Sequence, residues 1–190
     1  MRGLLAAGAA VVVVLSSGVA AQAAHAAHAA HTAHAAPAAA RASSGYVAAF
    51  PKYKAPKPFG TTFQSDPKHD FTKGIHSRHD GVLRGRITEI RGDVAEYEPI
   101  KWKKGTETEG YFVGPPQGDV MAYASPVAKD VVYLSAFGCS KSEGAMTVNR
   151  DTGLGNKRCA RSVLMKREGK PALITVYKGK IVQVQEIWTP

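Results

Sequence analysis

The chain has 190 residues, a formal net charge of +10 and a pI near 9.7. This length allows one domain with a tail. Residues 1–40 are dominated by Ala and contain no acidic residue, which excludes them as the source of a mixed globular core. The positive charge favours anionic partners, although solubility alone also explains it.

The first 23 residues have the organisation of a signal peptide. Arg2 gives a positive start, residues 4–15 are apolar, and small residues follow. Residues 21–23 (AQA) fit a cleavage site, and residues 24–26 (AHA) compete with them. An uncleaved membrane anchor is the alternative, and it is disfavoured by Ser16, Ser17, Gly18 and Gln22. We therefore expect a secreted protein, extracellular or associated with the cell wall.

Export determines how the two cysteines are interpreted. Cys139 and Cys159 are the only cysteines of the chain, and outside the reducing cytoplasm they are expected to form a disulfide. A catalytic thiolate is the alternative, but every His precedes residue 80. The sequence predicts the disulfide.

Residues 24–79 are predicted to form a low-complexity Ala/His tail followed by a linker rich in Pro and Lys. Residues 50–59 (FPKYKAPKPF) favour an extended strap with aromatic ends. The spacing of the histidines in the tail and linker suggests a Cu²⁺ or Zn²⁺ site as one interpretation. The candidate ligands are His25, His28, His31, His34, His76 and His79. No Cys or rigid frame completes a coordination sphere, so we expect no metal site and no cofactor.

From residue 80 the pattern changes to β-strands. Segments rich in β-formers cover residues 82–90, 94–102, 120–123 and 131–137, with weaker candidates at 111–113 and 145–148. Residues 158–168 favour a helix, and residues 172–177 and 180–188 favour a hairpin around a Lys-Gly turn. We predict that residues 80–190 form a mainly β domain. Its fold is expected to be a small antiparallel, partly closed barrel of the oligonucleotide/oligosaccharide-binding type, or a sandwich, with one short helix.

Residues Lys101, Trp102, Lys103 and Lys104 are the best candidate binding site. A Trp beside cations can stack on a sugar or base while the lysines hold anionic groups. The alternative is that Trp102 caps the barrel and the lysines form a solvated strand end. The common signatures of hydrolases, zinc enzymes and phosphate loops do not occur in the sequence. We name no catalytic residue.

Residues 82–102, the cysteines around residues 153–155, and the ending at residues 179–190 resemble small secreted proteins of actinobacteria. The Ala-rich leader agrees with this resemblance. It implies export and a compact β domain, and it implies no particular activity.

Three hypotheses about function follow. The first is an exported, non-enzymatic domain that binds an anionic extracellular polymer or a cell-surface component. The second is a secreted protein-binding or inhibitory module, and the third is a small hydrolase with scattered carboxylates. We do not expect nucleic acid as a partner, and a membrane enters only through an uncleaved signal segment.

Overall fold

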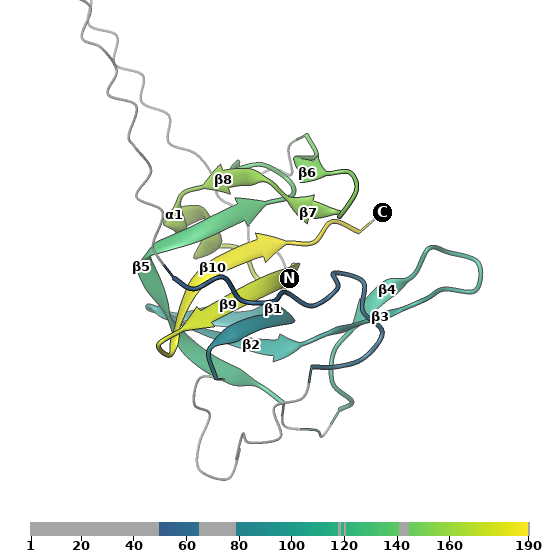
Figure 1. The fold of residues 1–190 in the computed structure, drawn as a ribbon, viewed down its shortest axis with the longest axis horizontal. Helices are drawn as coiled ribbons and strands as arrows, with labels where there is room; N and C mark the ends of the chain where they lie inside the picture. The colour runs from purple at the N-terminus through teal and green to yellow at the C-terminus, as the bar shows by residue number, and fades with distance from the viewer. Residues whose placement is uncertain (1–49, 65–78, 118, 120, 141–144, 190) are drawn as a thin grey trace, which may run out of the picture. The chain divides into compact units, whose positions relative to one another are not determined.

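The computed structural model describes residues 50–64, 79–117, 119, 121–140 and 145–189 (Figure 1). The predicted signal peptide, residues 1–23, lies outside the described residues. The same is true of His25, His28, His31, His34 and His76. The described part contains the strands β1 (Gly81–Arg91), β2 (Val94–Pro99), β3 (Lys101–Lys103), β4 (Tyr111–Val113), β5 (Tyr123–Ser135), β6 (Val148–Asn149), β7 (Leu154–Gly155), β8 (Lys157–Cys159), β9 (Pro171–Tyr177) and β10 (Lys180–Glu186), and the helix α1 (Arg161–Leu164).

Five of these strands close into a barrel. β1 pairs with β2 and β9, β9 pairs with β10, and β2 pairs with β5, all antiparallel. β10 then pairs with β5 in parallel, which closes the ring. Counted along the chain, the barrel strands follow the ring order 1-2-3-5-4, with α1 between the third and fourth. This is the arrangement of the oligonucleotide/oligosaccharide-binding barrels, so the predicted fold class is confirmed.

The third barrel strand, β5, is longer than the sequence pattern indicates. We predicted separate strands at residues 120–123 and 131–137, and this was wrong, because β5 runs unbroken for 13 residues. Its first part pairs with β2 and its last part pairs with β10. The exposed Pro126, Lys129 and Asp130 lie where β5 changes partner. Residues that break a simple pattern are tolerated there because the ladder is irregular.

The helix is shorter than predicted. We expected it over residues 158–168, but residues 157–159 form β8, which pairs with β5 in the register Tyr133↔Cys159. A disulfide joins Cys159 to Cys139, just beyond the end of β5, as predicted. The pairing and the disulfide hold these residues extended, so α1 covers only Arg161–Leu164. In the described part of the chain, no helix is long and apolar enough to cross a membrane.

The predicted hairpin near the C-terminus is formed by β9 and β10. Its two turn residues both have positive φ, 49° at Lys178 and 69° at Gly179. Positive φ at both central positions matches the right-handed twist of the flanking strands. The turn therefore sets the register in which β10 pairs with β9.

Side-chain alternation fills the barrel. Along β2, Ala95 and Tyr97 are buried, while Glu96 and Glu98 point to the opposite side. Tyr97 stacks on Tyr123 at 5.6 Å between ring centroids, and its hydroxyl lies 3.0 Å from Ser125 Oγ. The apolar interior combines these residues with others from β1, β5, β9 and β10, including Leu83, Ile87, Val131, Tyr133, Ile174, Val176, Ile181 and Val184.

Candidate functional site

The hairpin of β3 and β4 extends away from the barrel (Figure 1). Its register pairs Trp102 with Phe112 and Lys103 with Tyr111. Because side chains alternate along a strand, Trp102 and Phe112 share one face, and Lys101, Lys103 and Tyr111 share the other. The hairpin therefore separates an aromatic face from a cationic face.

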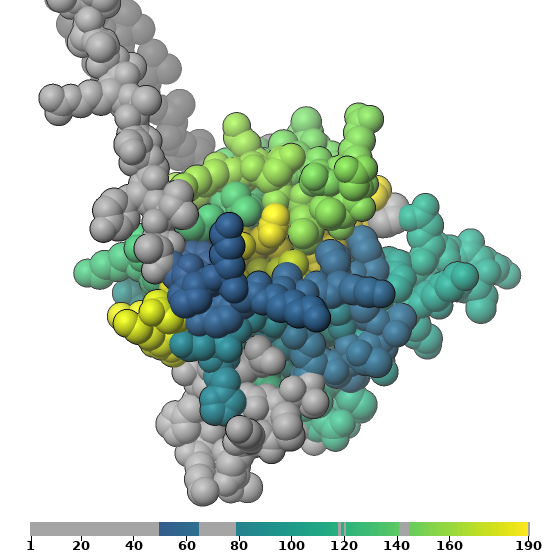
Figure 2. Space-filling model, in the orientation of Figure 1, coloured from purple at the N-terminus to yellow at the C-terminus, as the bar shows by residue number. Residues whose placement is uncertain are grey.

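A strap of residues 50–64 lies across the barrel (Figure 2). These residues fall in the predicted linker of residues 24–79, and they belong with the barrel to one compact unit. Phe59 of the strap lies 5.1 Å from Trp102 and 6.0 Å from Phe112, measured between ring centroids. The Trp102 backbone N–H donates to Gly60 O at 2.9 Å. The strap thus completes the aromatic face of the hairpin.

A buried arginine of β1 anchors this strap. Arg84 is 2% exposed, and its guanidinium donates to three backbone carbonyl groups. The acceptors are Ile100 O at 3.0 Å, Lys57 O at 2.7 Å and Thr62 O. Burial lowers the pKa of Arg84 from its ordinary value. Two of the three acceptors belong to the strap, so Arg84 fixes its path and the position of Phe59.

The cationic face borders a groove of about 550 Å³, which we call the lysine groove. It is lined by Thr61, Phe63, Lys101, Trp102, Lys103, Lys104, Val113, Gly114 and Pro116. The structure thus brings all four sequence-predicted binding residues together. Lys101 Nζ lies 4.6 Å from the centre of the Phe63 ring, and Lys103 Nζ lies 5.7 Å from that of Tyr111. These cation–π contacts hold the ammonium groups beside the groove.

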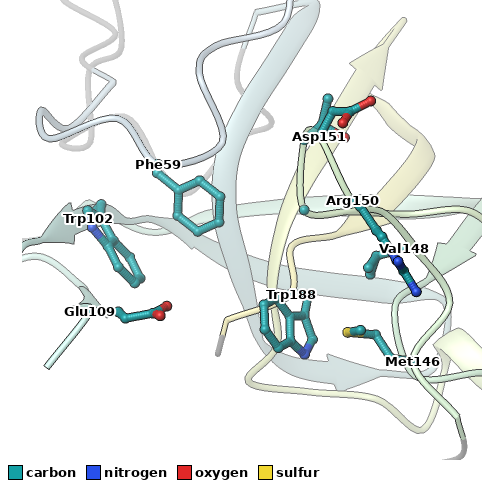
Figure 3. Close-up of a pocket in the computed structure, with 10 residues that line it drawn as sticks. Phe59, Trp102, Glu109, Met146, Val148, Arg150, Asp151 and Trp188 are labelled. Carbon is teal, nitrogen blue, oxygen red and sulfur yellow. The ribbon is translucent and has the colours of Figure 1, made fainter.

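A second groove, of about 440 Å³, lies on the aromatic side of the hairpin, and we call it the aromatic groove. Its apolar lining comes from Phe59, Trp102, Met146, Val148 and Trp188. Figure 3 shows Phe59 and Trp102 on one side, Met146 and Val148 on the other, and Trp188 between them. Glu109, Arg150, Asp151 and Thr152 add polar groups.

The turn that carries the second wall of the aromatic groove is held rigidly. Asn149 Oδ1 accepts hydrogen bonds from the backbone of Asp151 at 2.9 Å and Thr152 at 3.2 Å. Gly153 has φ 68° and accepts a hydrogen bond from Trp188 N at 2.8 Å. A Cβ on Gly153 would lie 3.2 Å from the Phe59 ring, so this residue packs its backbone directly on the strap.

The barrel interior holds a carboxylate that sequence reasoning missed. Glu186 is 1% exposed and accepts hydrogen bonds from Ser135 Oγ at 2.8 Å, Ala136 N at 2.7 Å and the Tyr133 hydroxyl. Arg167 Nη1 lies 3.5 Å from its Oε1. Burial and the Glu186 carboxylate raise the pKa of Tyr133 far above its ordinary value. The signal in the sequence is the position of Glu186, in phase with the buried Val182 and Val184 of β10.

The outward carboxylates of β1 and β2 are held by neighbouring groups. Glu98 Oε1 lies 2.6 Å from Arg86 Nη2, and Glu89 Oε1 lies 2.7 Å from Arg91 Nε. Glu96 accepts a hydrogen bond from Thr88 at 3.1 Å. This side of the barrel therefore carries several carboxylates.

The described residues include few of the candidate metal ligands that the sequence suggested. His79 is the one candidate ligand that falls within them. No group of three or more His, Cys, Asp or Glu side chains in the described ranges is arranged to hold a metal ion.

The fold and the two grooves together define a disulfide-stapled five-stranded barrel with a projecting, two-faced hairpin. No family model, no curated protein and no solved structure matches this chain.

Proposed function

We propose that this protein is exported and acts, without catalysis, by binding an anionic extracellular or cell-surface polymer in the lysine groove. The observation that carries the proposal is the charge of this groove. Three lysines line it, and no carboxylate is present among its described lining residues. Such a concentration of one charge raises the local concentration of an oppositely charged chain.

The form of the groove supports a polymer rather than a small anion. Lys101 and Lys103 stand on the same face of β3, and Lys104 follows at the strand end. Lys103 and Lys104 are exposed. The anionic groups that bind these lysines must therefore approach along an open groove of about 550 Å³. A chain with repeated carboxylate, sulfate or phosphate groups can contact several of these ammonium groups at once.

The positions of the carboxylates on the barrel strands support binding rather than hydrolysis. Glu98 and Glu89 are engaged in ion pairs with Arg86 and Arg91. Glu186 is buried among hydrogen-bond donors inside the barrel. A general acid and base must instead face a substrate.

The location of the charges also favours an acidic glycan over nucleic acid. Barrels of this type bind oligonucleotides on the face of their second and third strands. Here the second strand, β2, carries Glu96 and Glu98 on its outward side. The Glu96 carboxylate repels a phosphate backbone, whereas Glu98 is paired with Arg86. The lysine groove lies on the projecting hairpin instead.

Export is supported by the leader-like residues 1–23 and by the disulfide between Cys139 and Cys159. Disulfides persist in oxidising compartments and are rare in the cytosol. A basic groove on an exported protein meets acidic polymers of the cell surface.

The test is retention of the purified full chain on immobilised dextran sulfate and polygalacturonate, eluted with increasing salt. We expect retention at low salt and a linear fall of log affinity with log salt. Lys103→Gln/Lys104→Gln should elute at lower salt, with the salt slope reduced by about one per lysine. The matched control is Lys129→Gln/Lys157→Gln, which removes the same charge from two exposed lysines outside the groove.

Three outcomes overturn the proposal. The wild-type chain passes through both columns at low salt, or the two double variants elute at the same salt concentration. In the third, single-stranded DNA and free dextran sulfate are compared as competitors that displace the bound protein from the column. If DNA displaces the protein at a lower concentration of charged groups than dextran sulfate does, the groove is assigned to nucleic acid.

A further inference from the structure

The aromatic groove contains large apolar side chains that are exposed to solvent. Met146 is 50% exposed and Phe59 is 36% exposed, and both line this groove beside Trp102 and Trp188. Exposed apolar patches rimmed by polar groups mark places where a ligand binds. The volume, about 440 Å³, falls within the range of about 300–1,000 Å³ typical of ligand pockets.

The rings of the groove are held in place before any ligand arrives. Phe59 and Phe112 contact Trp102 with interplanar angles of 78° and 69°. Gly110 lets the hairpin backbone approach the indole, because a Cβ there would lie 2.6 Å from Trp102 Cζ2. Trp188 is tied to Gly153 by a backbone hydrogen bond of 2.8 Å. Rigid aromatic walls reduce the entropy lost on binding.

The charges of this groove differ from those of the lysine groove. Glu109 and Asp151 oppose Arg150, so its lining carries one net negative charge where the lysine groove carries three positive charges. Within the described residues, none of these three side chains forms an ion pair with another residue. They are available to donate to and accept from hydroxyl groups. This complement suits an uncharged, hydroxyl-rich ligand and disfavours a polyanion.

One common class of ligand combines apolar faces with a hydroxyl rim. A pyranose ring whose hydroxyls are equatorial presents C–H groups on both faces and hydroxyls around its edge. Electropositive C–H groups pack on the negative faces of aromatic rings. In a β-1,4-linked chain, successive rings keep these faces available, which matches walls on two sides of one groove.

We propose that the aromatic groove binds a short stretch of an uncharged β-1,4-linked pyranose chain. The sugar faces pack against Trp102 and Trp188, and the hydroxyls hydrogen-bond to Glu109, Arg150 and Asp151. Trp102 lines both grooves, but this proposal does not depend on the function proposed for the lysine groove.

The test is titration of the full chain with cellohexaose and with the hexamer of β-1,4-linked N-acetylglucosamine, followed by tryptophan fluorescence and by calorimetry. We expect at least one of the two oligosaccharides to bind, with an affinity that changes little between low and high salt. Trp188→Ala should weaken binding about 10–100-fold, which is the range for loss of one stacking ring.

Because Trp188 is half-buried, its substitution by Ala can also weaken the fold. A second variant therefore tests the groove from an exposed position. Met146→Arg places a long side chain in the groove from an exposed position, and we expect it to abolish binding while the circular dichroism spectrum is kept. Its matched control is Val94→Arg, because Val94 is also exposed, at 42%, and does not line the groove. Val94→Arg should bind like the wild type.

The proposal is overturned if neither hexamer binds at millimolar concentration, or if Met146→Arg and Val94→Arg bind equally well. Binding that disappears at high salt also overturns it, because that behaviour belongs to charge pairing. Retention on dextran sulfate is measured separately, so failure of one site leaves the result for the other intact.

Discussion

The buried carboxylate of Glu186 offers the most direct test of how the barrel is held together. We predict that Glu186→Gln strongly destabilises the fold. The substitution keeps the size of the side chain but replaces one acceptor oxygen with an NH2 group. The donors around it are Ser135 Oγ, Ala136 N and the Tyr133 hydroxyl. An amide oxygen cannot serve all of them, so at least one buried donor loses its acceptor.

The size of the effect follows from two contributions. A buried donor without a partner costs about 1–3 kcal/mol. Arg167, whose side chain is 11% exposed, also loses its buried anion, and breaking such a pair costs about 3–5 kcal/mol. Arg167 keeps hydrogen bonds to Gly138 O at 3.0 Å and Ser140 O at 2.9 Å. These remaining hydrogen bonds place the total cost near the lower end of the sum, at about 4–5 kcal/mol.

The assay is urea unfolding of the full chain at neutral pH, followed by tryptophan fluorescence. With an m-value of about 1–3 kcal/mol per M, the midpoint should fall by more than 1 M. Glu96→Gln is the matched control, because Glu96 lies on the outward side of β2 and accepts one hydrogen bond from Thr88. It should cost less than about 1 kcal/mol. Equal midpoints for the two variants would refute the reasoning.

Three further predictions concern the remaining features of the barrel. Burial and a neighbouring carboxylate raise the pKa of Tyr133, so the unfolded chain ionises this phenol at a lower pH than the folded protein does. The free energy of unfolding should therefore fall as the pH rises above about 10; urea unfolding checks this, and an equal fall in Tyr133→Phe would contradict it. Cys139→Ser/Cys159→Ser opens a loop with a sequence separation of 20, which should cost about 3 kcal/mol; unchanged unfolding midpoints would argue against the staple. Gly153→Ala and Gly92→Ala both place a side chain at positive φ, at 68° and 58°, at a cost of about 1–2 kcal/mol each. Gly153→Ala should lower the melting temperature further, because its Cβ also meets the strap at 3.2 Å while nothing lies within 4 Å of a Cβ at Gly92; equal melting temperatures would count against that contact.

Local sequence patterns predicted those parts of the fold that depend on near neighbours. Alternation along residues 172–188 and the Lys178-Gly179 turn predicted the hairpin of β9 and β10, which the structure confirms. Two isolated cysteines predicted the disulfide, which also forms. Both features are set within about 20 residues of chain, where periodicity and turn chemistry carry the information.

Local sequence patterns did not predict features that depend on pairing between segments far apart in the chain. The sequence pattern predicted two separate strands, at residues 120–123 and 131–137, but pairing with two different neighbours overrides local preference between them. Residues 158 and 159 were predicted to be helical, but they belong to a strand, residues 157–159, because β5 provides an edge for it.

The candidate site shows the same division. The sequence placed Trp102 beside its lysines in the chain, and these residues do share a groove. It could not bring Phe59 and Trp188 to Trp102, since these residues meet only after the strap and the end of β10 have docked.

The parallel pairing of β10 with β5 has a consequence for how the molecule assembles. β10 is the last strand of the barrel to be synthesised, and both of its neighbours have an open edge until it arrives. An incomplete chain that ends before residue 180 would leave the edges of β5 and β9 available to strands of other molecules. Closure must therefore follow synthesis of the whole barrel, and until then the nascent protein depends on its surroundings to keep those edges from joining a neighbour.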